Sequence, residues 1–116
     1  MSPRSLNVLV CGFALVLAAC SRPQSSPRAA PVRTYVVIDN QSFVDHRIFV
    51  MNGSSRLRVG FAPGKQLTKM TIPASVVTGA HMLVFVAEPL GGDRPARSEE
   101  IYVSEGDEVR LMIPPF

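Results

Sequence analysis

Beyond residue 33 the chain alternates between apolar and polar positions in short runs, and turn-forming residues separate these runs. Alternation with a period of two is typical of a strand with one buried face. Clusters of Gly, Pro, Asn, Asp and Ser mark the ends of such strands. The pattern predicts seven strands, over residues 34–38, 44–51, 56–61, 66–72, 82–87, 100–103 and 108–113. Residues 74–79 are predicted to form a loop or a single helical turn.

The third predicted strand shows the alternation most clearly. Leu57, Val59 and Phe61 should face the core, because they occupy every second position. Arg56 and Arg58 should then face the solvent. This register places a pair of arginines on the outer surface of the domain.

The turns and the buried centre are also readable from residue types. Asn52-Gly53-Ser54-Ser55 is a strong hairpin signal, because Asn and Gly tolerate a positive φ. Pro63-Gly64 fits the two central positions of a type II turn. Residues 82–87 are apolar without interruption, as in a strand covered on both faces. The longest predicted loop runs from Pro89 to Arg97.

These elements predict an all-β fold over residues 33–116, a small antiparallel β-sandwich of the immunoglobulin-like type. A small β-barrel is the alternative. True immunoglobulin domains contain a Cys…Trp…Cys core, whereas this chain has no Trp and its two cysteines both precede residue 33. Only the general architecture is therefore expected.

The N-terminal segment has a different pattern. Arg4 gives it a positive charge, and an apolar run extends from Leu6 to Leu17 before the small residues Ala18 and Ala19. A basic start, an apolar core of about 7–15 residues and a small-residue cleavage site define a secretory signal peptide. The alternative is a transmembrane anchor, but a spanning helix needs about 20 apolar residues, more than this run supplies.

Leu17-Ala18-Ala19-Cys20 resembles the lipobox of bacterial lipoproteins. The resemblance implies that Leu17, Ala18 and Ala19 form the cleavage site and that signal peptidase cuts before Cys20. It also implies that Cys20 is lipidated, with palmitate-type acyl chains that anchor the protein in the membrane. Ser21 stands where an aspartate would favour the inner membrane, so the pattern implies the outer membrane, facing the periplasm, if the source is Gram-negative.

The sequence thus predicts three segments: a signal peptide over 1–19, a lipidated cysteine with a Pro- and Ser-rich tether over 20–32, and the β-sandwich over 33–116. An extended tether, at about 3.1 Å per residue, would reach roughly 40 Å from the bilayer. Cleavage removes Cys11 and the lipid caps Cys20, so no disulfide is expected.

The formal net charge is +3, from 12 basic and 9 acidic residues. Most basic residues precede residue 73, and most acidic residues follow it. Such a split creates a dipolar surface, or alternatively the charges interleave once the strands pair. Nucleic acid is not an expected partner, because the predicted compartment is the cell envelope and the chain has no aromatic and basic platform for single strands.

Candidate catalytic and metal-binding residues are few. His46 and His81 are the only histidines, fewer than zinc sites use, and the lipid-capped cysteine removes the blue-copper ligand set. Asp45-His46 and Glu99-Glu100 are neighbours on predicted strands, so their side chains point to opposite faces. We therefore expect no enzyme activity, no metal site and no cofactor.

The best candidate binding surface is basic. Arg56 and Arg58 should lie beside Arg47 on the neighbouring strand, and Asp93 and Arg94 lie in the longest loop. Loops at the ends of a rigid scaffold are common binding sites. The alternative is that these arginines form a solvated face that resists aggregation.

A wider resemblance covers most of the predicted domain. Its residues are mainly those of turns and strands, in the segments 53–60, 72–73, 83–91, 98–99 and 106–107. They are similar to those of small exported bacterial lipoproteins that have one β domain and no assigned activity. The resemblance bears on the fold more than on function. The lipobox, the tether and the absence of catalytic motifs favour a non-catalytic module that binds another envelope component by a strand edge or end loops. The alternative is a lipoprotein that binds a metal, a glycan or an anionic solute. The oligomeric state is left open.

Overall fold

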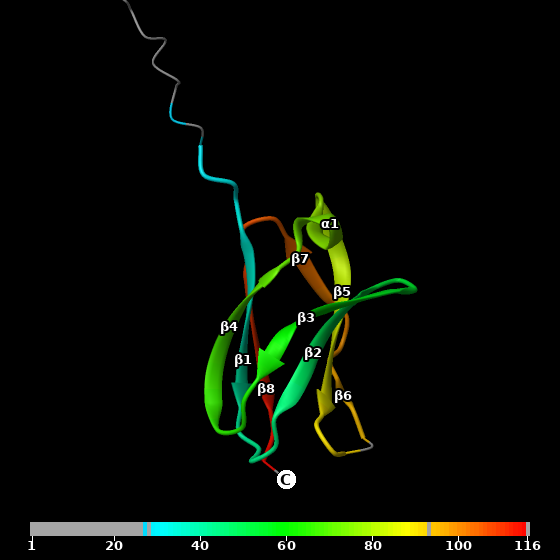
Figure 1. Cartoon of the computed structure of the whole chain (residues 1–116). Helices are drawn as coiled ribbons and strands as arrows, with labels where there is room; N and C mark the ends of the chain where they lie inside the picture. The colour runs from blue at the N-terminus through cyan, green and yellow to red at the C-terminus, as the bar shows by residue number, and fades with distance from the viewer. Residues whose placement is uncertain (1–26, 28, 93, 116) are drawn as a thin grey trace, which may run out of the picture.

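The computed structural model describes residue 27 and residues 29–92 and 94–115. The predicted signal peptide, Cys20 and most of the tether lie outside the described residues. Two sheets of three and five strands pack face to face as a sandwich (Figure 1). The predicted all-β sandwich is confirmed, and the sheets do not close into the alternative barrel.

The seven predicted strands are all present, with bounds within two residues of those expected. The elements are β1 (Thr34–Asn40), β2 (His46–Asn52), β3 (Ser55–Ala62), β4 (Gln66–Ile72), α1 (Ala74–Val77), β5 (Ala80–Pro89), β6 (Ala96–Arg97), β7 (Ile101–Ser104) and β8 (Glu108–Ile113). The segment after β4 is a single helical turn, one of the two forms expected for it. Residues 96 and 97, expected in a loop, form β6 instead.

The first sheet has the order β4-β1-β8. β1 pairs with β4 in antiparallel fashion but with β8 in parallel, so one strand pair departs from the antiparallel arrangement expected. The Tyr35 N–H donates to Asp107 O and the Gln41 N–H donates to Ile113 O, each at 2.9 Å. The first and last strands of the domain therefore lie side by side.

The second sheet has the order β3-β2-β5, and β6 and β7 both pair with the free side of β5. β6 and β7 are one bulged strand, because Arg97 pairs with Val86 whereas Ile101 pairs with Leu83. At the bulge the Phe85 N–H donates to Ser98 Oγ at 2.8 Å, and the Ser98 N–H donates to Phe85 O at 2.8 Å. The sheet thus keeps its hydrogen bonds across the irregularity.

The core lies between the sheets and is formed by aliphatic side chains from both. Val36, Ile48, Val50, Leu83 and Val103 are each at most 1% exposed. Every residue from 83 to 87 is buried, as predicted, whereas Met82, the first residue of the run predicted to be covered on both faces, is 49% exposed. Burial of such a side chain contributes about 1.5–3 kcal/mol to folding, so this central layer supplies much of the stability.

A bulge in the β2–β3 hairpin changes which side chains of β3 face inward. The register shifts between Ile48 and Phe49, so Val59 is an extra residue on β3. Phe61 then pairs with the exposed Arg47 and is itself 39% exposed. The prediction that Phe61 faces the core is wrong, because one extra residue reverses the alternation beyond it.

The β3–β4 turn also differs from the expected type II turn. Gly64 does not have the positive φ that a type II turn requires at its second central position, whereas Lys65 has φ 57°. Gly64 is needed for another reason. A Cβ on Gly64 would lie 2.5 Å from Phe43 O and 2.7 Å from Phe43 C. The turn therefore packs against the β1–β2 connection through the bare backbone of Gly64.

We predict that Gly64→Ala destabilises the protein by more than about 2 kcal/mol, because the added methyl group collides with backbone atoms that cannot rotate away. Chemical denaturation measures this loss. Ser54→Ala, at the exposed tip of the β2–β3 hairpin, should change stability by less than about 0.5 kcal/mol. Equal stability of Gly64→Ala and the parent chain would show that the turn does not pack as described.

Candidate functional site

An apolar groove opens along the side of the sandwich. One wall is the β6–β7 strand over residues 96–101, and the other is β8 with Pro114, over residues 111–114. The groove has a volume of about 620 Å³. It lies where the two sheets end at strands that have no outer neighbour in the described part of the chain.

The floor of the groove is the core itself. Ile38, Ile48, Phe85 and Ile113 line it and are each at most 4% exposed. Polar side chains of the lining are confined to the β6–β7 wall, which carries the exposed residues 97, 99 and 100. An occupant of the groove would therefore bury apolar groups against the floor and leave its polar groups at the rim.

The outer edge of β8 offers backbone hydrogen-bonding groups to such an occupant. Asp107 and Ile113 accept hydrogen bonds from β1, so the odd-numbered residues of β8 point their backbone groups at β1. In a parallel pair the N–H and C=O of one residue point to the same side. The N–H and C=O groups of Glu108, Arg110 and Met112 consequently face the free edge, where the described strands supply no pairing.

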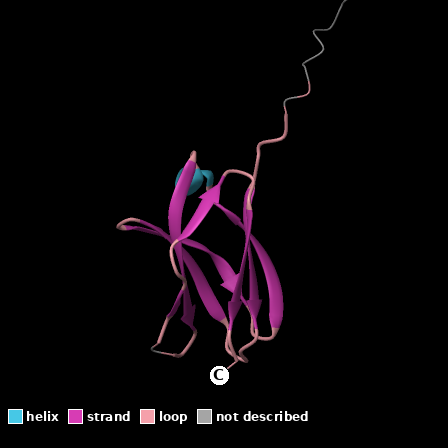
Figure 2. Ribbon diagram, turned by 180° about the vertical axis from the view of Figure 1, so that it is seen from behind, coloured by secondary structure: helices cyan, strands magenta, loops and turns pink. Residues whose placement is uncertain are grey.

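The structure brings three of the predicted binding residues onto one surface. Arg47, Arg56 and Arg58 all face outward from the β2–β3 hairpin, whose tip projects beyond the sandwich in both ribbon views (Figures 1 and 2). Arg56 is already engaged. Its guanidinium lies 4.0 Å from the centroid of the Phe49 ring and forms an ion pair with Glu88. Arg47 and Arg58 form no ion pair with any described residue.

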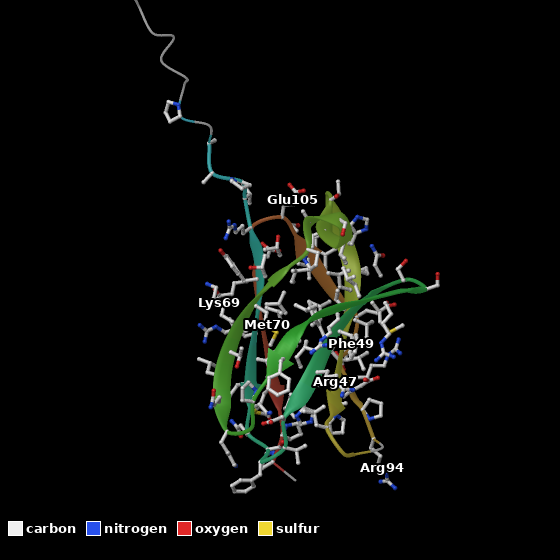
Figure 3. The ribbon with its side chains drawn as sticks, viewed as in Figure 1. Arg47, Phe49, Lys69, Met70, Arg94 and Glu105 are labelled. Carbon is white, nitrogen blue, oxygen red and sulfur yellow. The ribbon has the colours of Figure 1, made fainter. Side chains whose placement is uncertain are left out.

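The other predicted binding residues lie elsewhere. Figure 3 shows Arg94 at the tip of the loop between β5 and β6, pointing away from the sheet and apart from Arg47. Asp93 lies outside the described residues. A polar hollow of about 350 Å³ between Arg47, Glu88 and the turn over residues 89–92 separates the two regions. Its lining carries both charge signs, so it is not a simple anion site.

A buried polar cluster joins the two sheets at one end. Asn40 is fully buried, and its side-chain amide donates to the carbonyl oxygens of Val44, Ala62 and Pro63 at 2.8, 3.1 and 3.1 Å. Its Oδ1 accepts the N–H of Ser42 at 3.1 Å. One side chain thus serves the end of β1, the β1–β2 turn and the β3–β4 turn.

The histidines and methionines do not gather at one place. His46 is fully buried, and its Nδ1 lies 2.9 Å from Val44 O, whereas His81 Nε2 lies 2.7 Å from Thr78 O. Met70 is buried in the core, but Met82 and Met112 are about half exposed. Among the described residues, no group of three or more His, Cys, Asp and Glu side chains is placed to hold a metal ion.

The outer face of the three-stranded sheet carries a charged network. Lys69 Nζ donates to Glu108 Oε2 at 2.7 Å and lies 4.2 Å from the centroid of the Tyr35 ring. The hydrogen bond from Lys69 holds the pKa of Glu108 below its ordinary value, and Arg110 adds to the effect. The pairing covers Val37, which is only 4% exposed on this outer face. The charged network therefore has a structural role, because it covers an apolar side chain on the outer face of the sheet.

Comparison with protein-family models, with curated proteins and with solved structures finds no significant match for this chain. In the described part of the chain, no helix is both long enough and apolar enough to span a bilayer. The features of the molecule that bear on function are therefore the groove, the free edge of β8 and the surfaces described above.

We predict that Asn40→Asp destabilises the protein by at least about 2 kcal/mol, because it replaces a buried donor by an oxygen that faces three carbonyl oxygens. The shape and the acceptor for Ser42 are retained, so the loss reports the replacement of the donor by a carboxylate oxygen, including the cost of burying its charge. Urea denaturation gives the difference.

Asn52→Asp is the matched control, since the half-buried Asn52 makes one long hydrogen bond, at 3.4 Å to Val76 O. It should cost less than about 1 kcal/mol. Equal losses in the two variants would contradict the role assigned to Asn40.

Proposed function

We propose that this protein is a lipid-anchored, non-catalytic interaction module of the bacterial cell envelope. In this proposal it binds an extended segment of another envelope protein in the groove between β8 and the β6–β7 strand. The observation that carries the proposal is the coincidence of an apolar groove with an unpaired strand edge. The Leu17–Cys20 motif supports the anchor, with Cys20 as the lipidated residue.

Strand addition suits this groove for two reasons. An extended segment beside β8 would pair with the N–H and C=O groups of Arg110 and Met112, which would provide main-chain hydrogen bonds. Every second side chain of that segment would then point at the floor formed by Ile38, Ile48 and Phe85. Backbone pairing supplies affinity and the apolar floor supplies selectivity, as in other proteins that bind peptides at a sheet edge.

The alternative function is the binding of a small ligand, a metal, a glycan or an anionic solute. The groove volume lies within the range of about 300–1,000 Å³ that is usual for ligand pockets. The polar hollow beside Arg47 offers fewer arguments, because Glu88 shares its lining. The free edge of β8 favours an extended chain over a compact ligand, since a compact ligand leaves that edge unused.

The lipid anchor is tested by Cys20→Ala in the full chain. We predict that the parent protein incorporates labelled palmitate and sediments with membranes, whereas Cys20→Ala does neither. Cys11→Ala is the matched control and should retain both properties, because cleavage before Cys20 would remove residue 11. Palmitate incorporation that survives Cys20→Ala would contradict the anchor.

The groove is tested by Met112→Pro, which removes an N–H from the free edge and leaves the hydrogen bonds to β1 intact. With a photoreactive benzoylphenylalanine in place of Arg97, the partner should crosslink in intact cells. We predict that Met112→Pro lowers this crosslinked fraction at least about tenfold, the loss expected when about 1.4 kcal/mol of binding is removed.

Leu111→Pro is the contrasting variant. Its N–H faces β1, so this change should weaken the fold itself and lower the melting temperature. Met112→Pro should melt close to the parent chain. An unchanged crosslinked fraction in folded Met112→Pro would contradict strand addition at β8.

A further inference from the structure

The β1–β2 turn holds an exposed aromatic side chain in a fixed position. Phe43 is 81% exposed, although its neighbour Ser42 is fully buried. Ser42 Oγ donates to Val44 O and accepts the Val44 N–H, both at 3.1 Å. The Ser42 carbonyl accepts the Lys65 N–H at 2.9 Å. The residues on both sides of Phe43 are therefore locked, and the ring is displayed from a rigid support.

Asp45 holds the turn from the other side. Its Oδ1 accepts the Gly64 N–H at 2.8 Å, and its carbonyl accepts the Leu90 N–H at 2.9 Å. The Asp45 carboxylate is thereby committed to the backbone of the neighbouring turn. The cation beside Phe43 then comes from Lys65, whose Nζ lies 4.3 Å from the centroid of the Phe43 ring.

Lys65 adopts a backbone conformation that lysine rarely takes. Its φ of 57° lies in the left-handed region, where Gly or Asn is usual. A glycine, Gly64, directly precedes Lys65, but it does not occupy the left-handed position. Lys65, which supplies the charge, occupies it instead. Strain retained at an exposed position is a reason to look for a function there.

We propose that Phe43 and Lys65 form an anchor that inserts into an apolar pocket with a carboxylate rim on a partner protein. Rigid aromatic side chains dominate many interfaces, because little conformational entropy is lost when they bind. Phe43 fills the pocket, and the Lys65 ammonium pairs with the carboxylates at its edge. This surface is separate from the groove at β8.

The position of Phe43 favours a protein as its partner. The other candidate is the membrane that would hold the lipid of Cys20. Residues 29–33 enter the sandwich at the end opposite the β1–β2 turn (Figure 1). β1 alone spans seven residues between the two ends, roughly 23 Å at about 3.3 Å per residue. This choice of partner rests on the lipid anchor at Cys20 proposed above. A domain held from its tether would present Phe43 away from the lipid surface.

The first test is photocrosslinking in cells that produce the full chain, with benzoylphenylalanine in place of Phe43. The same analogue in place of Tyr102, an aromatic residue 65% exposed on β7, is the matched control. We expect position 43 to crosslink to a protein at a site formed by apolar residues beside Asp or Glu. Position 102 should not give this product.

Adducts at position 43 to lipid, or only to a second copy of this chain, would overturn the inference, as would no adduct. Palmitate labelling of Cys20 in the same cells separates a failed lipid anchor from a failed Phe43 site.

The second test separates binding from folding through Lys65. Lys65→Gly relieves the left-handed strain, so it should raise the melting temperature by about 4–8 °C while lowering the crosslinked fraction at position 43 at least about tenfold. Lys65→Arg keeps the charge and should keep the crosslink. A more stable Lys65→Gly variant that still crosslinks fully would overturn the role of Lys65. Loss of the crosslink in both variants would also overturn the role of its charge.

Discussion

The side-chain amide of Asn40 is the interaction on which the arrangement of this sandwich depends. It sits at the end of β1 and shares its two N–H groups among three carbonyl oxygens, two of them in the segment that leads out of β3. The next residue, Gln41, donates its N–H to Ile113 at the end of β8. One corner therefore fixes the ends of both sheets. A buried amide with all its partners in place specifies a single arrangement, because any displacement leaves polar groups unpaired.

The parallel pairing of β1 and β8 ends at the same corner, and it determines where the sandwich stays open. One edge of β8 pairs with β1, and the other edge lies beside the groove. Short length and charged residues are common protections for an exposed edge. Here Glu108 and Arg110 lie on the strand and Pro114 follows its end. These features limit unselective pairing, so an occupant must match the apolar floor as well as the backbone.

The strands were predictable because their side chains are governed by local burial. The alternation in β3 and the continuous apolar run in β5 each located a strand to within two residues. The bulge at Val59 was not predictable, since it is a feature of how β3 pairs with β2, and beside it Gly60 packs closely against Met70 on another strand. A Cβ on Gly60 would lie 2.7 Å from Met70 Sδ. The parallel pairing of the two terminal strands depends equally on contacts between distant segments.

In the candidate sites, too, the features set by local pattern were predictable, and those set by contacts between distant segments were not. Arg47, Arg56 and Arg58 were placed on one outer face by strand periodicity, but the engagement of Arg56 by Phe49 and Glu88 depends on how β3, β2 and β5 pair. Asn40 belongs to a residue type that is common in exposed turns, so composition alone could not separate a buried hub from a solvated turn. The groove was not foreseeable from local pattern, because it arises where two non-neighbouring edge strands face each other.

Amide hydrogen exchange along β8 tests the central claim, that its outer edge is open to a partner strand. In the full chain without a partner, the N–H groups of Val109, Leu111 and Ile113 face β1 and should exchange at least about 100-fold more slowly than those of Arg110 and Met112. Addition of an extended partner segment should then protect Arg110 and Met112. Uniform protection along β8 in the isolated protein would contradict the account, because the edge would already be covered.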